Sequence, residues 1–183
     1  MSDLFPRVKR HGYDAEEVKQ FLDAAREAYS TPMSEPAKLT AEEIRHTAFS
    51  MRKDGYSPAH VDAALERLED AFAARERDRA LAEAGPEAWT AHVRSTAQAI
   101  LDRAARPDGH KFKRVGVLTT GYHPEDVDRF ARKIRGYFEQ GKPLTVDEVR
   151  TVAFRPRRGG YSETQVDLVL DSVTSVMLAV KQQ

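Results

Sequence analysis

Apolar residues recur at helical spacing in several stretches of the chain. One stripe occupies positions i, i+3, i+4, i+7 and i+11 within residues 61–72, and the same offsets recur within residues 166–177. Shorter stripes lie within residues 18–25 and 89–101. This period is typical of amphipathic helices that bury one face against a core.

Helix-start signals precede some of these stripes. Thr40 with Glu43, and Thr145 with Glu148, have the spacing of a capping box. The one segment with strand-like character is the brief stretch Val115–Leu118. We therefore predict an all-α protein of about seven helices, with no more than a short strand at 115–118.

The dipeptide Gly-Tyr occurs four times, each time after a Phe and before a helix that carries a Val. The four copies are Gly12-Tyr13, Gly55-Tyr56, Gly121-Tyr122 and Gly160-Tyr161. Glycine adopts backbone angles that other residues avoid. We therefore predict a tight turn at each copy, with the adjacent Tyr packed onto the following helix.

The four copies form two larger repeats. Residues 39–65 and 144–170 match each other in the order Leu-Thr, Glu, Arg, Ala-Phe, Gly-Tyr and Val-Asp. We predict tandem helical-hairpin repeats in two modules, residues 1–72 and 112–183, each containing two Gly-Tyr units. An Ala-rich helical spacer at residues 73–111 joins them, because alanine is frequent up to residue 105 and rare after it.

The pattern Leu-Thr-x-x-Glu-(Ile/Val)-Arg-x-x-Ala-Phe, a loop, Gly-Tyr and Val-Asp resembles the N-terminal domain of DivIVA. DivIVA proteins are bacterial scaffolds that mark division sites and cell poles. The resemblance implies a short helix, a crossing loop and a longer helix that pairs with a partner. It also implies a non-catalytic adaptor or scaffold in cell division or polar growth.

The sequence departs from DivIVA in two respects. In DivIVA a Phe-Arg pair just before Gly-Tyr touches the membrane, whereas none of the four copies here has that Phe. The apolar heptads that a long coiled coil requires break after Phe72 at Arg75 and Arg79. The four units pair either within one chain or with a second copy, so a homo-oligomer remains open.

Composition excludes several classes of protein. The 29 Lys and Arg balance 29 Asp and Glu, which removes a global electrostatic reason to bind nucleic acid. The absence of Cys excludes disulfides and thiolate chemistry. The sequence has no apolar run of about 20 residues and no apolar leader. We expect a cytoplasmic protein, either free or at the membrane periphery.

Positive charge concentrates in the loops before each Gly-Tyr, and we predict that these loops contact a partner. The candidate residues are Arg7, Arg10, Arg52, Lys53, Lys113, Arg114, Arg155, Arg157 and Arg158. Solvated loop charge is the simplest interpretation. An acidic or phosphorylated protein and an anionic membrane are the two functional ones. We favour a protein partner because the loops lack the membrane-inserting Phe.

Two further functions are disfavoured. A DNA-binding helix-turn-helix needs a turn of about 3–4 residues, whereas Phe49 to Ser57 is longer, and the following helices begin with acidic residues. For catalysis, the chain has no phosphate loop, no His-Glu-x-x-His motif and no nucleophile elbow. We therefore predict no enzyme activity and assign no catalytic, cofactor-binding or metal-binding residue.

Overall fold

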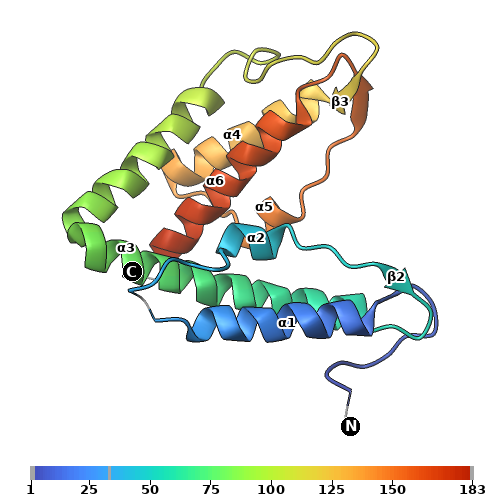
Figure 1. Ribbon diagram of the computed structural model, residues 1–183. Coiled ribbons are helices and arrows are strands. Elements are labelled where there is room, and N and C mark those ends of the chain that lie inside the picture. The colour runs from blue at the N-terminus through green and yellow to red at the C-terminus, as the bar shows by residue number, and fades with distance from the viewer. Residues whose placement is uncertain (1–2, 33, 182–183) are drawn as a thin grey trace. The chain divides into compact units, whose positions relative to one another are not determined.

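The computed structural model describes residues 3–32 and 34–181, and most of these residues are helical (Figure 1). The predicted mainly helical class is thus confirmed. The elements in order are β1 (Gly12–Tyr13), α1 (Ala15–Ser30), α2 (Ala41–Arg45), β2 (Met51–Arg52), α3 (Pro58–Ala104), β3 (Thr120–Tyr122), α4 (Pro124–Gln140), α5 (Val146–Arg150), β4 (Pro156–Arg158) and α6 (Glu163–Lys181).

Among the described residues, α3 contains two of the predicted helices, one on each side of a break, so the count agrees with the predicted seven. Gly85 interrupts α3 with φ 83° and ψ 163°, and Pro86 follows at a position that suits the start of a helix. The chain divides close to this break into a first unit, Met1–Glu83, and a second unit, Ala84–Gln183. This division does not coincide with the predicted module limits at 72 and 112, which stay predictions about the repeat.

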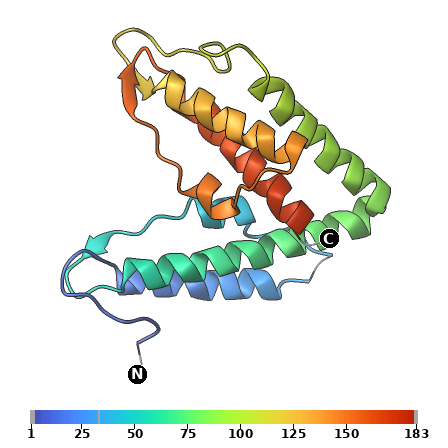
Figure 2. The ribbon, with the colours of Figure 1, turned by 180° about the vertical axis from the view of Figure 1, so that it is seen from behind.

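In the first unit, α1 and the first segment of α3 lie side by side (Figures 1 and 2). Both helices begin next to the paired strands β1 and β2, so they run in the same direction, and α2 lies in the connection between them. One buried cluster joins Ala28, Ile44 and Phe72. A second cluster, nearer the strands, joins Val18 to Tyr56 and Val61.

In the second unit, the latter segment of α3 packs with α4 and α6. Ile100, Ile134, Val173 and Met177 are buried together in its main cluster. Phe112, Val127, Tyr161 and Val166 form the cluster nearer to β3 and β4. The apolar stripe predicted within residues 166–177 therefore faces this core.

The strand prediction was wrong. Val115–Leu118 is not a strand, and the side chains of Val117 and Leu118 are 82% and 85% exposed in a turn. Two short antiparallel pairs form elsewhere, β1 with β2 and β3 with β4. They were missed because a pair of two or three residues built around glycine carries no alternating apolar pattern.

The predicted capping boxes at α2 and α5 are both present. Thr40 accepts a hydrogen bond from the backbone N–H of Glu43, and the Glu43 carboxylate accepts one from the Thr40 N–H. Thr145 and Glu148 make the same reciprocal pair. These bonds satisfy N–H groups that a helix start leaves without an intrahelical partner.

Glycine is required at the Gly-Tyr positions by close backbone approach. A Cβ atom on Gly12 would lie 2.5 Å from the carbonyl carbon of Gly55, and one on Gly160 would lie 2.5 Å from the carbonyl oxygen of Tyr122. Positive φ angles belong instead to preceding residues, at His11 (55°), Asp54 (56°) and Gly159 (63°). The Gly-Tyr positions therefore require glycine because two backbone segments approach closely there, and not because these glycines adopt the unusual backbone angles that we expected.

Replacing Gly160 with Ala is expected to destabilise the protein, because the new methyl group overlaps backbone that cannot move away alone. We expect the free energy of unfolding to fall by about 1–3 kcal/mol, the usual cost of overpacking. Urea denaturation followed by circular dichroism measures the change.

Gly116→Ala is the matched control in the same unit, because its nearest neighbour would be the Thr119 Oγ1 atom at 3.6 Å. Equal losses of stability in the two variants would contradict the close-approach explanation.

Candidate functional site

Backbone pairing brings the four predicted loops together two by two. The first loop end comprises residues 5–12 and 49–56, and the second loop end comprises residues 112–121 and 154–160. In the first, the Val8 N–H donates to the Gly55 carbonyl at 2.9 Å. In the second, the Val115 N–H donates to the Gly160 carbonyl, also at 2.9 Å. Each unit therefore presents one composite loop end.

The tyrosines of the Gly-Tyr pairs connect the two loops of each loop end through backbone hydrogen bonds. Tyr13 and Tyr56 exchange two backbone hydrogen bonds of 2.8 Å. The Tyr122 N–H donates to Tyr161 at 3.0 Å, and the Tyr161 N–H returns a bond of 2.8 Å. Tyr161 is fully buried and meets Phe112 edge-on, with ring centroids 5.4 Å apart.

Five of the nine predicted loop cations are engaged within the protein. Arg7 pairs with Asp3 and lies over the Tyr56 ring. Arg52 pairs with Asp14 at 2.6 Å. The remaining three bind neighbouring groups of the second unit: Arg114 donates to the Gly159 carbonyl, Arg155 pairs with Asp126, and Arg157 lies 3.0 Å from the His123 Nε2 atom. These side chains stabilise the loop ends themselves.

The Arg155–Asp126 pair is the most extensive of these contacts. The Arg155 Nε and terminal nitrogen donate to the two carboxylate oxygens of Asp126, each at 2.8 Å. These hydrogen bonds hold the pKa of the Asp126 carboxyl well below its usual range. The fork geometry is typical of arginine and joins the second loop end to the first turn of α4.

The other four predicted cations are exposed: Arg10, Lys53, Lys113 and Arg158. Within residues 3–32 and 34–181, none of their side chains makes a hydrogen bond or an ion pair. Arg10 and Lys53 lie in the first loop end, and Lys113 and Arg158 lie in the second. Their charge is therefore available to an external partner.

Lys111 is a loop cation that is not available. The residue is 3% exposed, and its ammonium group donates to the carbonyl of Ala104 at the end of α3. It also pairs with Asp108 at 3.2 Å. Lys111 thus stabilises the last turn of α3, where carbonyl groups lack an intrahelical partner.

Three aspartates that sequence reasoning did not single out as site residues bind the tyrosines. Tyr161 donates its hydroxyl proton to Asp128 at 3.0 Å. Tyr13 and Tyr122 bond in the same way to Asp62 and Asp167. All three aspartates belong to the Val-Asp pairs of the repeat. This recurrence was the signal in the sequence that could have identified them as tyrosine partners. Burial is the main cause that raises the pKa of Tyr122 and of Tyr161 to about 12.

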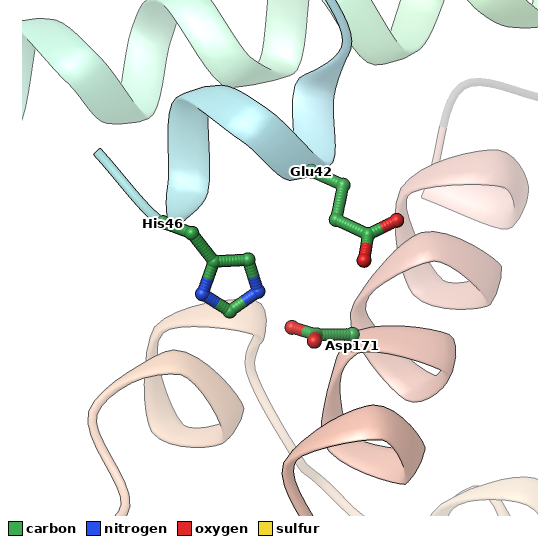
Figure 3. Close-up of side chains that lie close together, drawn as sticks. All are labelled: Glu42, His46 and Asp171. Atoms are coloured by element: carbon green, nitrogen blue, oxygen red, sulfur yellow. The ribbon is translucent and has the colours of Figure 1, made fainter. Parts of the chain in front are cut away.

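Figure 3 shows three side chains of ligand-forming type. Glu42 and His46 are one helical turn apart and project from α2 in the first unit. Asp171 projects from α6 in the second unit. Two ligands from one short helix do not define a metal site, so no metal is assigned to the first unit.

No family model, curated protein or solved structure matches the chain. The resemblance to DivIVA therefore rests on the sequence motifs alone. Among the helices that the structure describes, none combines the length and the apolar character needed to cross a membrane.

Tyr122 and Tyr161 are expected to titrate late, because burial raises the pKa of both side chains. A tyrosine whose folded pKa is raised contributes stability in full below its unfolded value of about 10, and this contribution is lost as the pH rises toward 12. Ultraviolet absorbance should show tyrosinate from Tyr122 and Tyr161 appearing near pH 12. Tyr161→Phe and Tyr122→Phe should each remove one late-titrating group, whereas late absorbance that is unchanged in both variants would contradict the assignment.

Proposed function

We propose that the protein is a non-catalytic adaptor or scaffold built from two DivIVA-like modules, which binds protein partners through its basic loop ends. The observation that carries this proposal is the strand pairing. It gathers four separate loops into two surfaces, so the exposed cations Arg10 and Lys53 belong to one surface, and Lys113 and Arg158 belong to the other.

Corresponding backbone contacts support the two-module interpretation. Ser57 donates to the carbonyl of Pro6, and Ser162 donates to that of Lys113, at 2.8 and 2.9 Å. The isolated bridge of Arg7 with Tyr56 has its counterpart in Arg114 with Tyr161. Repetition of the same hydrogen bonds in each unit is expected of two copies of one module.

The chemistry of the exposed cations favours an acidic or phosphorylated partner. An arginine guanidinium binds carboxylate and phosphate groups through two parallel hydrogen bonds. Within the described residues, each loop end has one arginine that makes no internal hydrogen bond or ion pair, Arg10 in the first and Arg158 in the second. Lysines add further positive charge, at Lys9 and Lys53 in the first loop end and at Lys113 in the second. The role in cell division or polar growth rests on the motif resemblance, and pairing with a second copy of the chain is compatible with it.

A variant that neutralises the four predicted loop cations without an internal bond tests this proposal: Arg10→Gln, Lys53→Gln, Lys113→Gln and Arg158→Gln. We expect it to fold normally, because these side chains make no internal bond within the described residues. It should lose most crosslinked protein partners in cells that produce the protein, as measured by mass spectrometry.

The matched control removes four cations outside the loop ends: Lys38→Gln, Arg94→Gln, Arg135→Gln and Lys142→Gln. This control should keep the partners. Equal partner recovery by both variants would rule out recognition through the loop ends.

A second candidate function, binding to an anionic membrane surface, is favoured by one observation. Seven positions separate Arg114 from Gly121, compared with five between Arg7 and Gly12. The longer loop exposes the apolar side chains of Val117 and Leu118 almost completely. Apolar side chains beside basic residues are suited to the membrane interface.

Co-sedimentation with phosphatidylglycerol vesicles at low and high salt tests this candidate. If it holds, Val117→Ser with Leu118→Ser should reduce binding, because the apolar contribution is lost. Leu168→Ser, which changes an exposed leucine on α6, is the control and should bind normally. Absence of vesicle binding by the unmodified protein at low salt would exclude the membrane function.

A further inference from the structure

One arginine in each loop end bonds to the residue at the start of the following helix, and the two pairs occupy matching positions. Asp14 and His123 each stand two positions after the first glycine of their loop end, and Arg52 and Arg157 each stand three positions before the second. The Arg52 Nε atom lies 2.6 Å from the Asp14 carboxylate. A terminal nitrogen of Arg157 lies 3.0 Å from the His123 Nε2 atom. The first loop end therefore has an ion pair where the second has an arginine–imidazole contact.

Backbone hydrogen bonds support the match between the two positions. The Asp14 N–H donates to the Ser50 carbonyl, and the His123 N–H donates to the Arg155 carbonyl, both at 2.8 Å. Asp14 is the N-cap of α1, and His123 is the N-cap of α4. The Asp14 carboxylate also accepts a bond from the Glu16 N–H, whereas the His123 side chain makes no capping bond. The same place is thus occupied by a carboxylate in one unit and by an imidazole in the other.

The contact with Arg157 determines where His123 can carry a proton. A guanidinium group has donors only, so the His123 Nε2 atom must accept and cannot carry a proton. The neutral imidazole then has its proton on Nδ1, which is buried and has no hydrogen-bond partner in the described part of the chain. A protonated imidazole donates from both nitrogens and accepts at neither, so it cannot keep this contact.

The two pairs respond differently to pH. Histidine is the residue type that ordinarily changes charge between pH 5 and 8, whereas an aspartate carboxylate ordinarily keeps its charge over this range. Protonation of His123 places a positive charge beside the Arg157 guanidinium. Arg157 is exposed, and the bond to His123 is the one that its side chain makes within residues 3–32 and 34–181. Arg157 therefore loses this bond when His123 is protonated, and Arg52 keeps its partner.

Charged groups of both signs surround His123. They come from the segment at β4 and from the first two turns of α4: Arg155, Arg157, Glu125, Asp126 and Arg129. Hydrogen bonds from Arg155 hold the pKa of the Asp126 carboxyl well below its usual range, so Asp126 stays ionised. Its negative charge interacts with His123. A protonated His123 therefore has a carboxylate nearby, while Arg157 is left without an acceptor.

We propose that His123 is a pH-sensitive switch of the second loop end, in which protonation releases Arg157 to the surface that binds an acidic or phosphorylated protein. The surface then gains the charge of His123 and an arginine with unoccupied donors. This inference rests on the proposed function, because it concerns regulation of the same basic surface. A partner should therefore bind the second loop end more tightly at acidic pH, through groups that the Asp14–Arg52 pair does not supply.

Nuclear magnetic resonance of the full-length chain tests the contact itself. Long-range proton–nitrogen spectra at about pH 8 should show His123 with its proton on Nδ1, assigned by comparison with the variant His123→Asp. On acidification to about pH 5.5, the guanidinium signal of Arg157 should shift in step with the His123 ring signals. A proton on Nε2 at the higher pH, or an Arg157 signal that does not follow His123, would overturn the proposal.

Sulfate is a suitable probe of the binding surface, because its charge does not change between these two pH values. The measured quantity is the ratio of the sulfate affinity at the lower pH to that at the higher pH, obtained from amide shifts of the second loop end. This ratio should be about threefold larger in the unmodified protein than in His123→Asp, as one exposed ionic contact allows. The nearby His11 and His110 are present in both proteins, so the comparison isolates His123.

The variant His123→Asp reproduces the pair of the first unit and should fold, because aspartate is a favourable N-cap residue. The reciprocal variant Asp14→His should give the first loop end a pH-dependent sulfate affinity that it lacks in the unmodified protein beyond the contribution of His11. Where Asp14→His does not fold, because the capping bonds of Asp14 are lost, His123→Asp alone decides the test. Equal affinity ratios in the unmodified protein and in His123→Asp, or no sulfate-induced shifts at either pH, would refute the switch.

The variant in which Arg10, Lys53, Lys113 and Arg158 are changed to Gln separates this proposal from the proposed function. Loss of cellular partners by that variant, together with equal sulfate affinity ratios in the unmodified protein and in His123→Asp, overturns the switch alone. A larger ratio in the unmodified protein, together with unchanged cellular partners, overturns recognition through the loop ends alone.

Discussion

The structure of each unit depends on the close approach of two backbone segments at the Gly-Tyr pairs. Tyr13 and Tyr56 exchange backbone hydrogen bonds only because Gly12 and Gly55 leave no side chain between the strands. The pairing fixes where the two following helices begin and makes them start at the same end. The aromatic rings and the loop cations take their positions from it.

Charge in the loop ends serves two purposes. Arg52 and Arg155 are held by Asp14 and Asp126, which stand at the starts of α1 and α4. These pairs close the loops onto the helices, and negative charge there also suits the helix dipole. Arg10, Lys53, Lys113 and Arg158 make no such pair within the described residues, so the neutral total of the chain conceals a local positive excess at each loop end.

The sequence predicted the features that depend on neighbouring residues. The capping box of Thr40 with Glu43 follows from a spacing of three, and the core face of residues 166–177 follows from helical periodicity. Long-range pairing was not predictable in this way. The burial of Lys111 has no local pattern, and the Val-Asp repeat marks Asp128 without showing that it binds Tyr161, because both features depend on segments brought together only by folding. The turn at Val117 was predicted to be part of a strand. A run of four mostly apolar residues does not show whether its side chains will be buried in a sheet or exposed in a turn.

The longer loop of the second unit lies between two fixed points. The Val115 N–H bond to Gly160 holds one side of it, and β3 holds the other. Inside these limits, Thr119 closes a turn back to the Gly116 carbonyl at 2.8 Å. The chain between the two anchors can thus change length and composition without altering the ladder. Residues 117 and 118 are therefore a position at which an inserted label or a new binding side chain leaves the surrounding backbone pairing unchanged.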